Sequence, residues 1–130
     1  MSILVKIGKM NIMKLKIKQG LRTGGEKVLE QKTIVLPRLD NLTPTMESTA
    51  LKLMEEAGEL AQAIGKLRGL SGERVKMDKE TVLSTITKEL LDVAQTAVSM
   101  MFVLEEQYGV DIQQTLDEHI AKLKRKGYLK

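Results

Sequence analysis

Apolar residues recur every three or four positions through the second half of the chain, a period typical of amphipathic helices. In the first such stretch, Thr43 is a suitable N-cap with Pro44 at the first helical position. The pattern runs to about Leu67 and stops at Gly69. The apolar stripe of this predicted helix consists of Leu53, Ala57, Leu60, Ile64 and Leu67.

Two further helices follow. The second is predicted to begin at Asp78 and to run to about Gln107, where Gly109 ends it. Asp111 resembles the first residue of a capping box and opens the third helix, which Gly127 closes. The second helix has the apolar stripe Val82, Ile86, Leu90, Val93, Ala97 and Leu104, and the third has Ile112, Leu116, Ile120 and Leu123.

The chain therefore reads as a basic N-terminal extension, residues 1–36, followed by a helical domain, residues 37–130. In the extension, apolar and polar residues alternate around Ile3–Ile7 and Leu15–Ile17, which suggests two short strands or a hairpin; the alternative is a disordered end. We expect an all-α fold, an antiparallel bundle of three to four main helices.

The second predicted helix has more apolar surface than one chain of this size can cover. A second apolar face lies beside its stripe, and the two together span about 200° of the circumference, whereas about 100° is usual for a surface helix. The residues of this second face are Leu83, Leu91, Ala94, Val98, Met101 and Phe102. This favours a homodimer or a dimer of dimers that completes the bundle. The alternative is that the N-terminal segment folds over this face.

Composition narrows the possible chemistry. Cysteine is absent and there is one histidine, which argues against thiolate chemistry and a zinc site. Residues 1–38 carry nine Lys or Arg and two acids, so the positive charge lies in the extension, but no motif supports nucleic-acid binding, which we regard as unlikely. No apolar run is long enough to span a membrane and no signal peptide is recognisable, so we expect a cytoplasmic protein without membrane contact.

Two pairs of carboxylates stand out. Glu56 and Glu59 lie three residues apart on the first helix, and Glu89 and Asp92 have the same spacing on the second. At about 100° per residue, both pairs fall on the same flank of their stripes. Packing the stripes together brings four acids to the edge of one interface, where they repel unless a cation lies among them. The pattern predicts a site for Mg²⁺, or Mn²⁺, and the metal suggests phosphate chemistry. The alternative is a set of exposed acids paired with nearby lysines.

The sequence around these acids resembles a known family. The block Glu55-Glu56-Ala57-Gly58-Glu59-Leu60, followed after about thirty residues by Glu89-Leu90-Leu91-Asp92, is similar to the two-part signature of the MazG-like, all-α nucleoside triphosphate pyrophosphohydrolases. The similarity covers roughly Leu36 to Leu129. It implies hydrolysis of a (deoxy)nucleoside triphosphate to the monophosphate and pyrophosphate.

The resemblance assigns Glu56, Glu59, Glu89 and Asp92 as metal ligands and catalytic residues. Glu55 falls nearly opposite the stripe, so it is either a surface acid or a supporting catalytic group.

The substrate contacts are less well defined by the pattern. The third helix offers Lys122 and Lys126 to the phosphates, although the family often carries arginine where Lys126 stands. Lys52 and, for base stacking, Tyr128 are further candidates. Which nucleotide is bound stays open. The alternative function is a non-catalytic nucleotide-binding or regulatory helical dimer.

Overall fold

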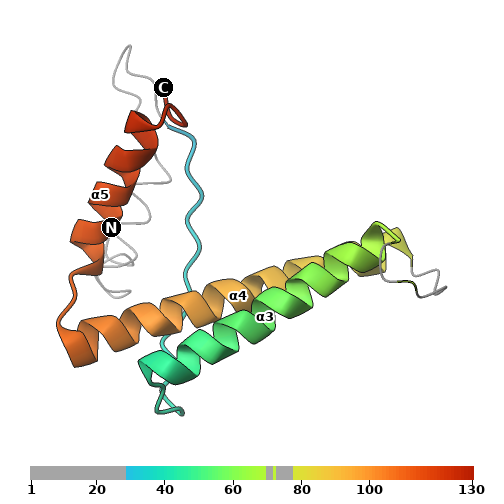
Figure 1. Ribbon diagram of the computed structural model, residues 1–130, viewed down its shortest axis with the longest axis horizontal. Coiled ribbons are helices and arrows are strands. Elements are labelled where there is room, and N and C mark those ends of the chain that lie inside the picture. Colours follow the sequence, from blue (N-terminus) through green and yellow to red (C-terminus); the bar gives the residue numbers. More distant parts are fainter. Residues whose placement is uncertain (1–28, 70–71, 73–77) are drawn as a thin grey trace, which may run out of the picture. The chain divides into compact units, whose positions relative to one another are not determined.

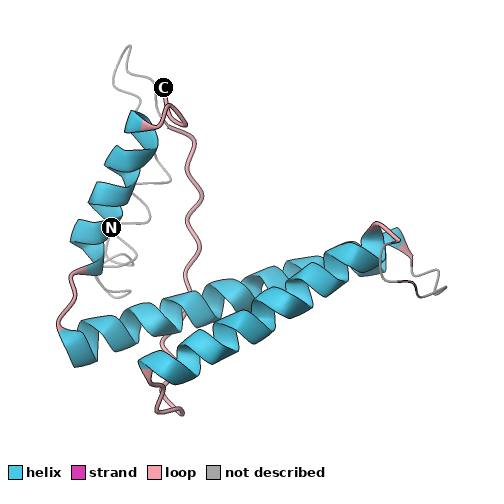
Figure 2. Cartoon of the chain, in the orientation of Figure 1, coloured by secondary structure: helices cyan, strands magenta, loops and turns pink. Residues whose placement is uncertain are grey.

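The computed structural model describes residues 29–69, 72 and 78–130, and within these the chain is helical with no strand (Figure 2). The chain divides into two units, Met1–Val35 and Leu36–Lys130, and the second contains all three described helices. The hairpin considered for residues 3–17 lies outside the described residues, and the boundary placed at residue 36 stays a prediction. None of the described helices is long and apolar enough to cross a membrane.

Helix α3 spans Met46–Leu67 and begins two residues later than the sequence suggested. Its N-cap is Thr45, not Thr43. The side chain of Thr45 accepts a hydrogen bond from the backbone N–H of Ser48 at 3.0 Å, and the Ser48 hydroxyl accepts one from the N–H of Thr45 at 2.9 Å. This reciprocal capping box satisfies two N–H groups at once, which a start at Pro44 cannot do. The predicted end is confirmed, since Gly69 adopts the left-handed conformation with φ +69°.

Helix α4 spans Lys79–Tyr108, and α5 spans Ile112–Arg125. Asp78 is the N-cap residue of α4, but its side chain accepts no capping hydrogen bond. Gly109 ends α4 in the left-handed conformation. Asp111 caps α5 by accepting the N–H of Gln114 at 2.9 Å. The predicted boundaries of both helices therefore hold to within a residue or two, because caps are local features of the sequence.

Helices α3 and α4 pack side by side as an antiparallel hairpin (Figure 1). The buried residues of α3 are Thr49, Glu56 and Ala63, which are seven positions apart. Those of α4 are Val82, Thr96, Ser99 and Val103. We call this line the seam. Spacing by seven is the geometry of two helices that wrap around each other, but most of the buried side chains here are small or polar.

The seam runs beside the predicted apolar stripe of α3 and not along it. Ala57 is exposed and Ile64 is 43% exposed, whereas Leu53, Leu60 and Leu67 are half-buried. Small side chains at Thr49 and Ala63 let the two backbones approach, and this rotates Ala57 and Ile64 away from α4. The rotation also moves Glu56 from the edge of the interface into it.

Residues 36–45, which we call the strap, cross the C-terminal half of α4. Three side chains of α4 hold it. Gln95 donates from Nε2 to the carbonyl of Pro37 at 2.9 Å, Gln107 donates to the carbonyl of Pro44 at 3.2 Å, and Glu106 forms an ion pair with Arg38. The strap thus covers one edge of the face that the sequence assigned to a partner subunit.

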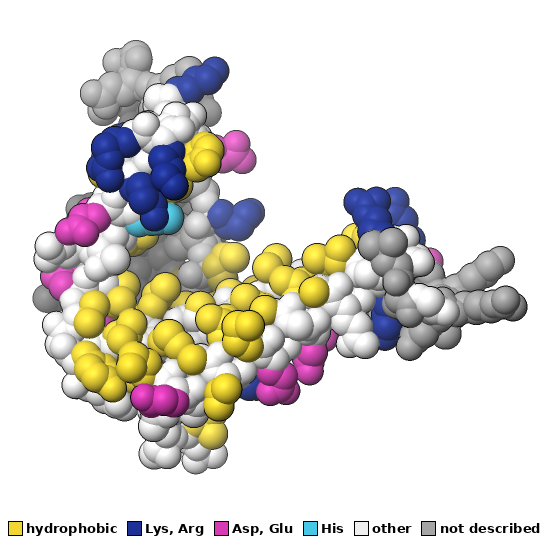
Figure 3. Space-filling view, in the orientation of Figure 1, with side chains coloured by type: hydrophobic (Ala, Val, Ile, Leu, Met, Phe, Trp, Pro, Cys, Tyr) yellow, Lys and Arg dark blue, Asp and Glu magenta, His cyan; other side chains and the backbone are white. Residues whose placement is uncertain are grey.

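Among the residues that the structure describes, nothing covers the rest of that face. Figure 3 shows apolar side chains gathered over the helical hairpin. On α4 the exposed residues are Leu83 at 44%, Leu90 at 54%, Leu91 at 42% and Met101 at 41%. At about 100° per residue, Leu83, Leu90 and Met101 point away from both the seam and the strap, whereas Leu91 lies toward the strap.

Helix α5 has no buried residue, and extensive packing between the described helices is confined to α3 and α4. Apolar surface of this extent suits a partner subunit, and the dimer stays a prediction.

Candidate metal centre and adjoining groove

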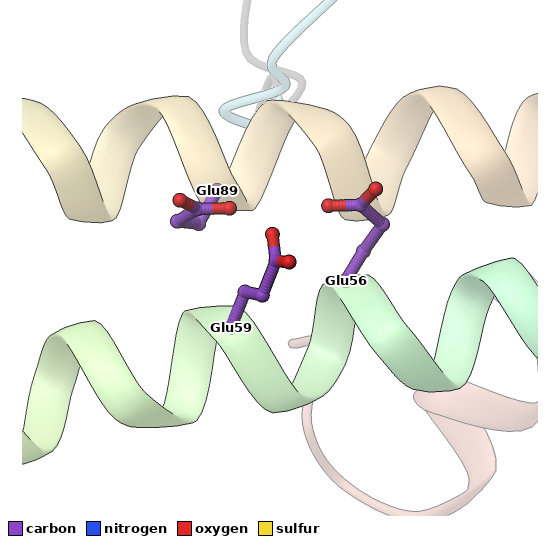
Figure 4. A group of neighbouring side chains, drawn as sticks. All are labelled: Glu56, Glu59 and Glu89. Carbon is purple, nitrogen blue, oxygen red and sulfur yellow. The ribbon is translucent and has the colours of Figure 1, made fainter.

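Three carboxylates from the two packed helices converge on one point. Glu56 and Glu59 project from α3 and Glu89 from α4, and the three side chains point toward one another (Figure 4). Each offers an oxygen such that all three oxygens lie within 4.8 Å of one another. Glu56 is buried at 6% exposure, Glu89 is half-buried and Glu59 is exposed. The cluster, which we call the acid trio, therefore opens to solvent on the side of Glu59.

The trio is electrostatically unsatisfied without a cation. The Oε2 atom of Glu89 is buried and has no hydrogen-bond partner. The pKa of Glu59 is raised above its ordinary value, first by the negative charge of Glu56, then by burial and by the charge of Glu89. A buried carboxylate oxygen without a donor is costly, so something absent from the polypeptide is expected to contact it. Three converging carboxylate oxygens fit Mg²⁺ or Mn²⁺, which prefer oxygen ligands.

One lysine already engages the trio. Lys52, one helical turn before Glu56, places its Nζ 2.8 Å from a carboxylate oxygen of Glu56 and 3.2 Å from one of Glu55. These two contacts raise the pKa of Lys52 well above its ordinary value, that with Glu56 first. Lys52 therefore stays charged, and it partly offsets the negative charge at the buried end of the trio. The sequence offered the pairing of acids with nearby lysines as an alternative to a metal site. The structure contains both the pairing of Glu55 and Glu56 with Lys52 and the cluster of three acids.

The other two acids of the sequence motif lie outside the trio. Asp92 is exposed, one helical turn beyond Glu89 on α4, and lines the same groove as Glu56. The side chain of Glu55 is 57% exposed and pairs with Lys52, as expected of a surface acid. The structure thus brings together three of the four acids assigned as ligands. The ligand role of Asp92 and a catalytic role of Glu55 stay predictions.

A groove of about 1160 Å³ opens beside the trio, between the strap, the first half of α3 and the second half of α4. The trio borders it at Glu56. Polar and charged side chains mix with one aromatic ring in its walls. They include Arg38, Thr45, Thr49, Lys52, Asp92, Gln95, Thr96, Ser99, Phe102 and Glu106. The guanidinium of Arg38 lies 5.9 Å from the centre of the Phe102 ring. A planar group would find both an aromatic face and hydrogen-bonding partners here.

A second, smaller cavity of about 320 Å³ borders the trio at its other members, Glu59 and Glu89. Ala63 and Val82 are its buried apolar residues. Its remaining walls are polar. They are formed by Gln62, Lys66 and Thr85.

The substrate residues predicted on and after α5 line neither of these two cavities. Lys122 and Lys126 belong to a basic cluster at the C-terminal end of α5, visible in Figure 3, and Tyr128 is 72% exposed. Their contacts with a substrate stay predictions.

The groove contains residues that the sequence did not single out. Phe102 had been placed on the dimer face, whereas it lines the groove beneath the strap. Arg38 had been counted only as a charge. In the sequence, the strap is recognisable only as a segment with two prolines and several polar residues just before α3. This composition does not indicate which helix the strap contacts. The partners of this segment are about 60 residues away, at Gln95 and Gln107.

Comparison with protein families agrees with this geometry. The MazG nucleotide pyrophosphohydrolase domain matches residues 44–127, which include both acid pairs and the whole of all three described helices. Comparisons with curated proteins and with solved structures give no significant match. The matched region is well over half of the chain, and it contains the acid trio. The chain belongs to the MazG nucleotide pyrophosphohydrolase family.

Proposed function

We propose that this protein hydrolyses a (deoxy)nucleoside triphosphate to the monophosphate and pyrophosphate in a Mg²⁺-dependent reaction. The observation that carries the proposal is the acid trio with its unpartnered Glu89 oxygen, next to a groove large enough for a nucleoside. Family membership supports the same class of reaction.

The ion would be held by Glu56, Glu59 and Glu89, with Asp92 as a further ligand after a change of rotamer. When bound, it would offset the negative charge of the triphosphate oxygens and that of the trio itself. The burial of Glu56 and its contact with Lys52 fix the carboxylate of Glu56 before anything binds.

The proposed hydrolysis requires one group that accepts a proton from the attacking water. Water attacks the α-phosphorus, the bond to the bridging oxygen between the α and β phosphorus atoms breaks, and pyrophosphate leaves with that oxygen. Glu59 is the exposed member of the trio, so solvent water reaches its carboxylate. We therefore assign the water's proton to a carboxylate oxygen of Glu59.

The nucleoside end of the substrate fits the groove. Phe102 offers a ring for base stacking, and the hydroxyl and amide groups of Ser99 and Gln95 lie beside it. We further propose that two copies of the chain associate through the uncovered face of α4. Such a dimer gives the basic cluster of α5, including Lys122 and Lys126, a route to the phosphates of the other copy.

The test is turnover of a panel of canonical and modified (d)NTPs with Mg²⁺ in water enriched in ¹⁸O. Attack at the α-phosphorus puts the label in the monophosphate, while attack at the β-phosphorus puts it in pyrophosphate. We expect labelled monophosphate, and loss of at least about a hundredfold in rate for Glu59→Gln, which removes the proton acceptor and a ligand.

Glu55→Gln on the same helix tests the remaining acid of the motif, and we expect it to keep most of the activity, because among the described residues the Glu55 carboxylate pairs with Lys52 alone. Orthophosphate release, or absence of turnover with the wild type and Glu59→Gln alike, would contradict the proposal. Nucleotide binding without any hydrolysis would point instead to a non-catalytic binding protein.

A further inference from the structure

The two cavities border the same three acids from different sides. The groove reaches Glu56, and the second cavity reaches Glu59 and Glu89. Because the oxygens of these residues lie within 4.8 Å of one another, one ion among them would face both cavities at once. A ligand whose charged centre sits at that ion can therefore extend one end into each cavity.

The two cavities differ in size and in chemistry. The groove is more than three times larger and contains the ring of Phe102 with Arg38 beside it. The second cavity is small, and no aromatic residue lines it. Besides the carboxylates of Glu59 and Glu89, its polar groups are an amide, an ammonium and a hydroxyl, from Gln62, Lys66 and Thr85. The Thr85 hydroxyl already donates to the carbonyl of Thr81, whereas the amide and the ammonium can donate hydrogen bonds to phosphate oxygens, which accept them.

Lys66 is set up to receive an anion. Along α3 the residues Lys52, Glu59 and Lys66 are spaced by seven, so they share one face of the helix, with each lysine about 10 Å along the axis from Glu59. Within the part of the chain that the structure describes, ion pairs engage Lys52 but none engages Lys66. The trio is thus flanked on the groove side by Lys52, which is paired with two glutamates, and on the other side by Lys66, which has no ion pair among the described residues.

Building on the proposed hydrolase function, we infer that the second cavity is the subsite for the leaving pyrophosphate. Lys66 binds its oxygens, with the amide of Gln62 as a further donor. The nucleoside then lies in the groove, and the α-phosphorus lies at the acid trio. This assigns the direction of the substrate along the helical hairpin, and it assigns a phosphate contact to α3, where the sequence pattern had offered only the lysines of α5.

Direct binding of inorganic pyrophosphate tests this subsite without any need to know the nucleotide. Calorimetric titration of the full-length protein with pyrophosphate in excess Mg²⁺ is expected to show binding. Lys66→Met should weaken it about tenfold or more, since a hydrogen bond to a charged group is lost. Lys66→Arg should restore most of the affinity. Lys88→Met is the control, because it removes the same charge next to Glu89 from a residue that lines neither cavity.

Binding of the nucleoside monophosphate product gives the second readout. Lys66→Met should leave its affinity unchanged, whereas Phe102→Ala should lower it. A purely structural role of Lys66 at the end of α3 would lower thermal stability and affect both ligands alike.

The inference is overturned if the wild type does not bind pyrophosphate, if Lys66→Met binds it as the wild type does, or if Lys66→Met weakens the monophosphate instead. None of these outcomes touches the proposed hydrolysis, which stands or falls on the labelled product.

Discussion

Lys52 and Glu56 form an ion pair, at 2.8 Å, between a half-exposed ammonium group and a carboxylate that the packing of α3 on α4 almost completely buries. The two residues are one helical turn apart, so the pair forms as soon as the helix does. The same carboxylate belongs to the acid trio. A metal ion that binds there must therefore share Glu56 with a positive charge that is already in place.

Replacing Lys52 is expected to change metal and nucleotide binding in opposite directions. In Lys52→Met, Mn²⁺ should bind up to about fivefold more tightly, the size expected for losing one partly exposed charge interaction. Nucleotide should bind more weakly, because Lys52 also lines the groove. Titration calorimetry with Mn²⁺ alone, and then with nucleotide at saturating Mn²⁺, measures both. Lys88→Met serves as the charge control. Parallel loss of both affinities would mean that Lys52 only supports the fold.

The acid trio should make the stability of the metal-free protein fall with rising pH. The pKa of Glu59 is raised in the folded state, chiefly by Glu56, from an ordinary value of 4.5. Just above pH 4.5 the folded protein therefore keeps a proton that the unfolded chain has lost. Because the unfolded state then binds fewer protons, the free energy of unfolding decreases as pH rises through the raised pKa.

This difference is measured by urea unfolding in EDTA between pH 4.5 and pH 7, comparing the wild type with Glu59→Gln. The wild type should lose more stability over this range, and Mg²⁺ should restore it at pH 7 but hardly at pH 4.5. Identical pH profiles of the two proteins would show that the trio does not repel as its geometry implies.

The strap is expected to matter for binding more than for folding. The Arg38–Glu106 pair is exposed on both sides, so Arg38→Ala should cost only about 0–1 kcal/mol of stability.

If the groove holds the base, Phe102→Ala should weaken nucleotide binding by about 1–3 kcal/mol, the usual value of stacking on an aromatic side chain. Fluorescent-nucleotide titration measures this, with Tyr108→Ala as the control for an aromatic residue outside the groove. Equal affinities would place the base elsewhere.

The uncovered face of α4 predicts an oligomer. Met101→Glu would put a charge into the centre of that face, where burial of an unpaired charge opposes association. Sedimentation velocity should show a dimer or larger species for the wild type and a monomer for Met101→Glu. Lys88→Glu introduces the same side chain on the side of α4 that faces away from this surface, and it should leave the association state unchanged. A monomeric wild type would refute the dimer.

The three helices could be predicted because their signals are local. Gly69, Gly109 and Asp111 act within one turn of the helix ends they define. The predicted start of α3 was wrong, because Thr43 before Pro44 and Thr45 are both acceptable N-cap residues. The reciprocal hydrogen bonds of Thr45 and Ser48 decide between them.

The seam and the groove could not be predicted in the same way. The apolar stripe of α3 points toward Ala57 and Ile64, but the approach of α4 follows the small residues Thr49 and Ala63. A helical wheel contains no term for how closely two backbones come together. The groove depends on hydrogen bonds between residues about 60 positions apart, such as Gln95 with Pro37, for which the sequence gives no periodic signal.

The burial of Glu56 in the line of closest helix contact has a mechanical consequence. Glu56 is both a candidate ligand of the ion and a buried residue at which α3 packs on α4. Binding of an ion would therefore also stabilise the packing of the two helices. A cation there would link α3 to α4, whose other buried side chains are mostly small. A shift of α3 along α4 by one helical turn would move Glu56 and Glu59 away from Glu89. Any contact that changes how closely α3 and α4 pack would therefore also change the geometry of the acid trio.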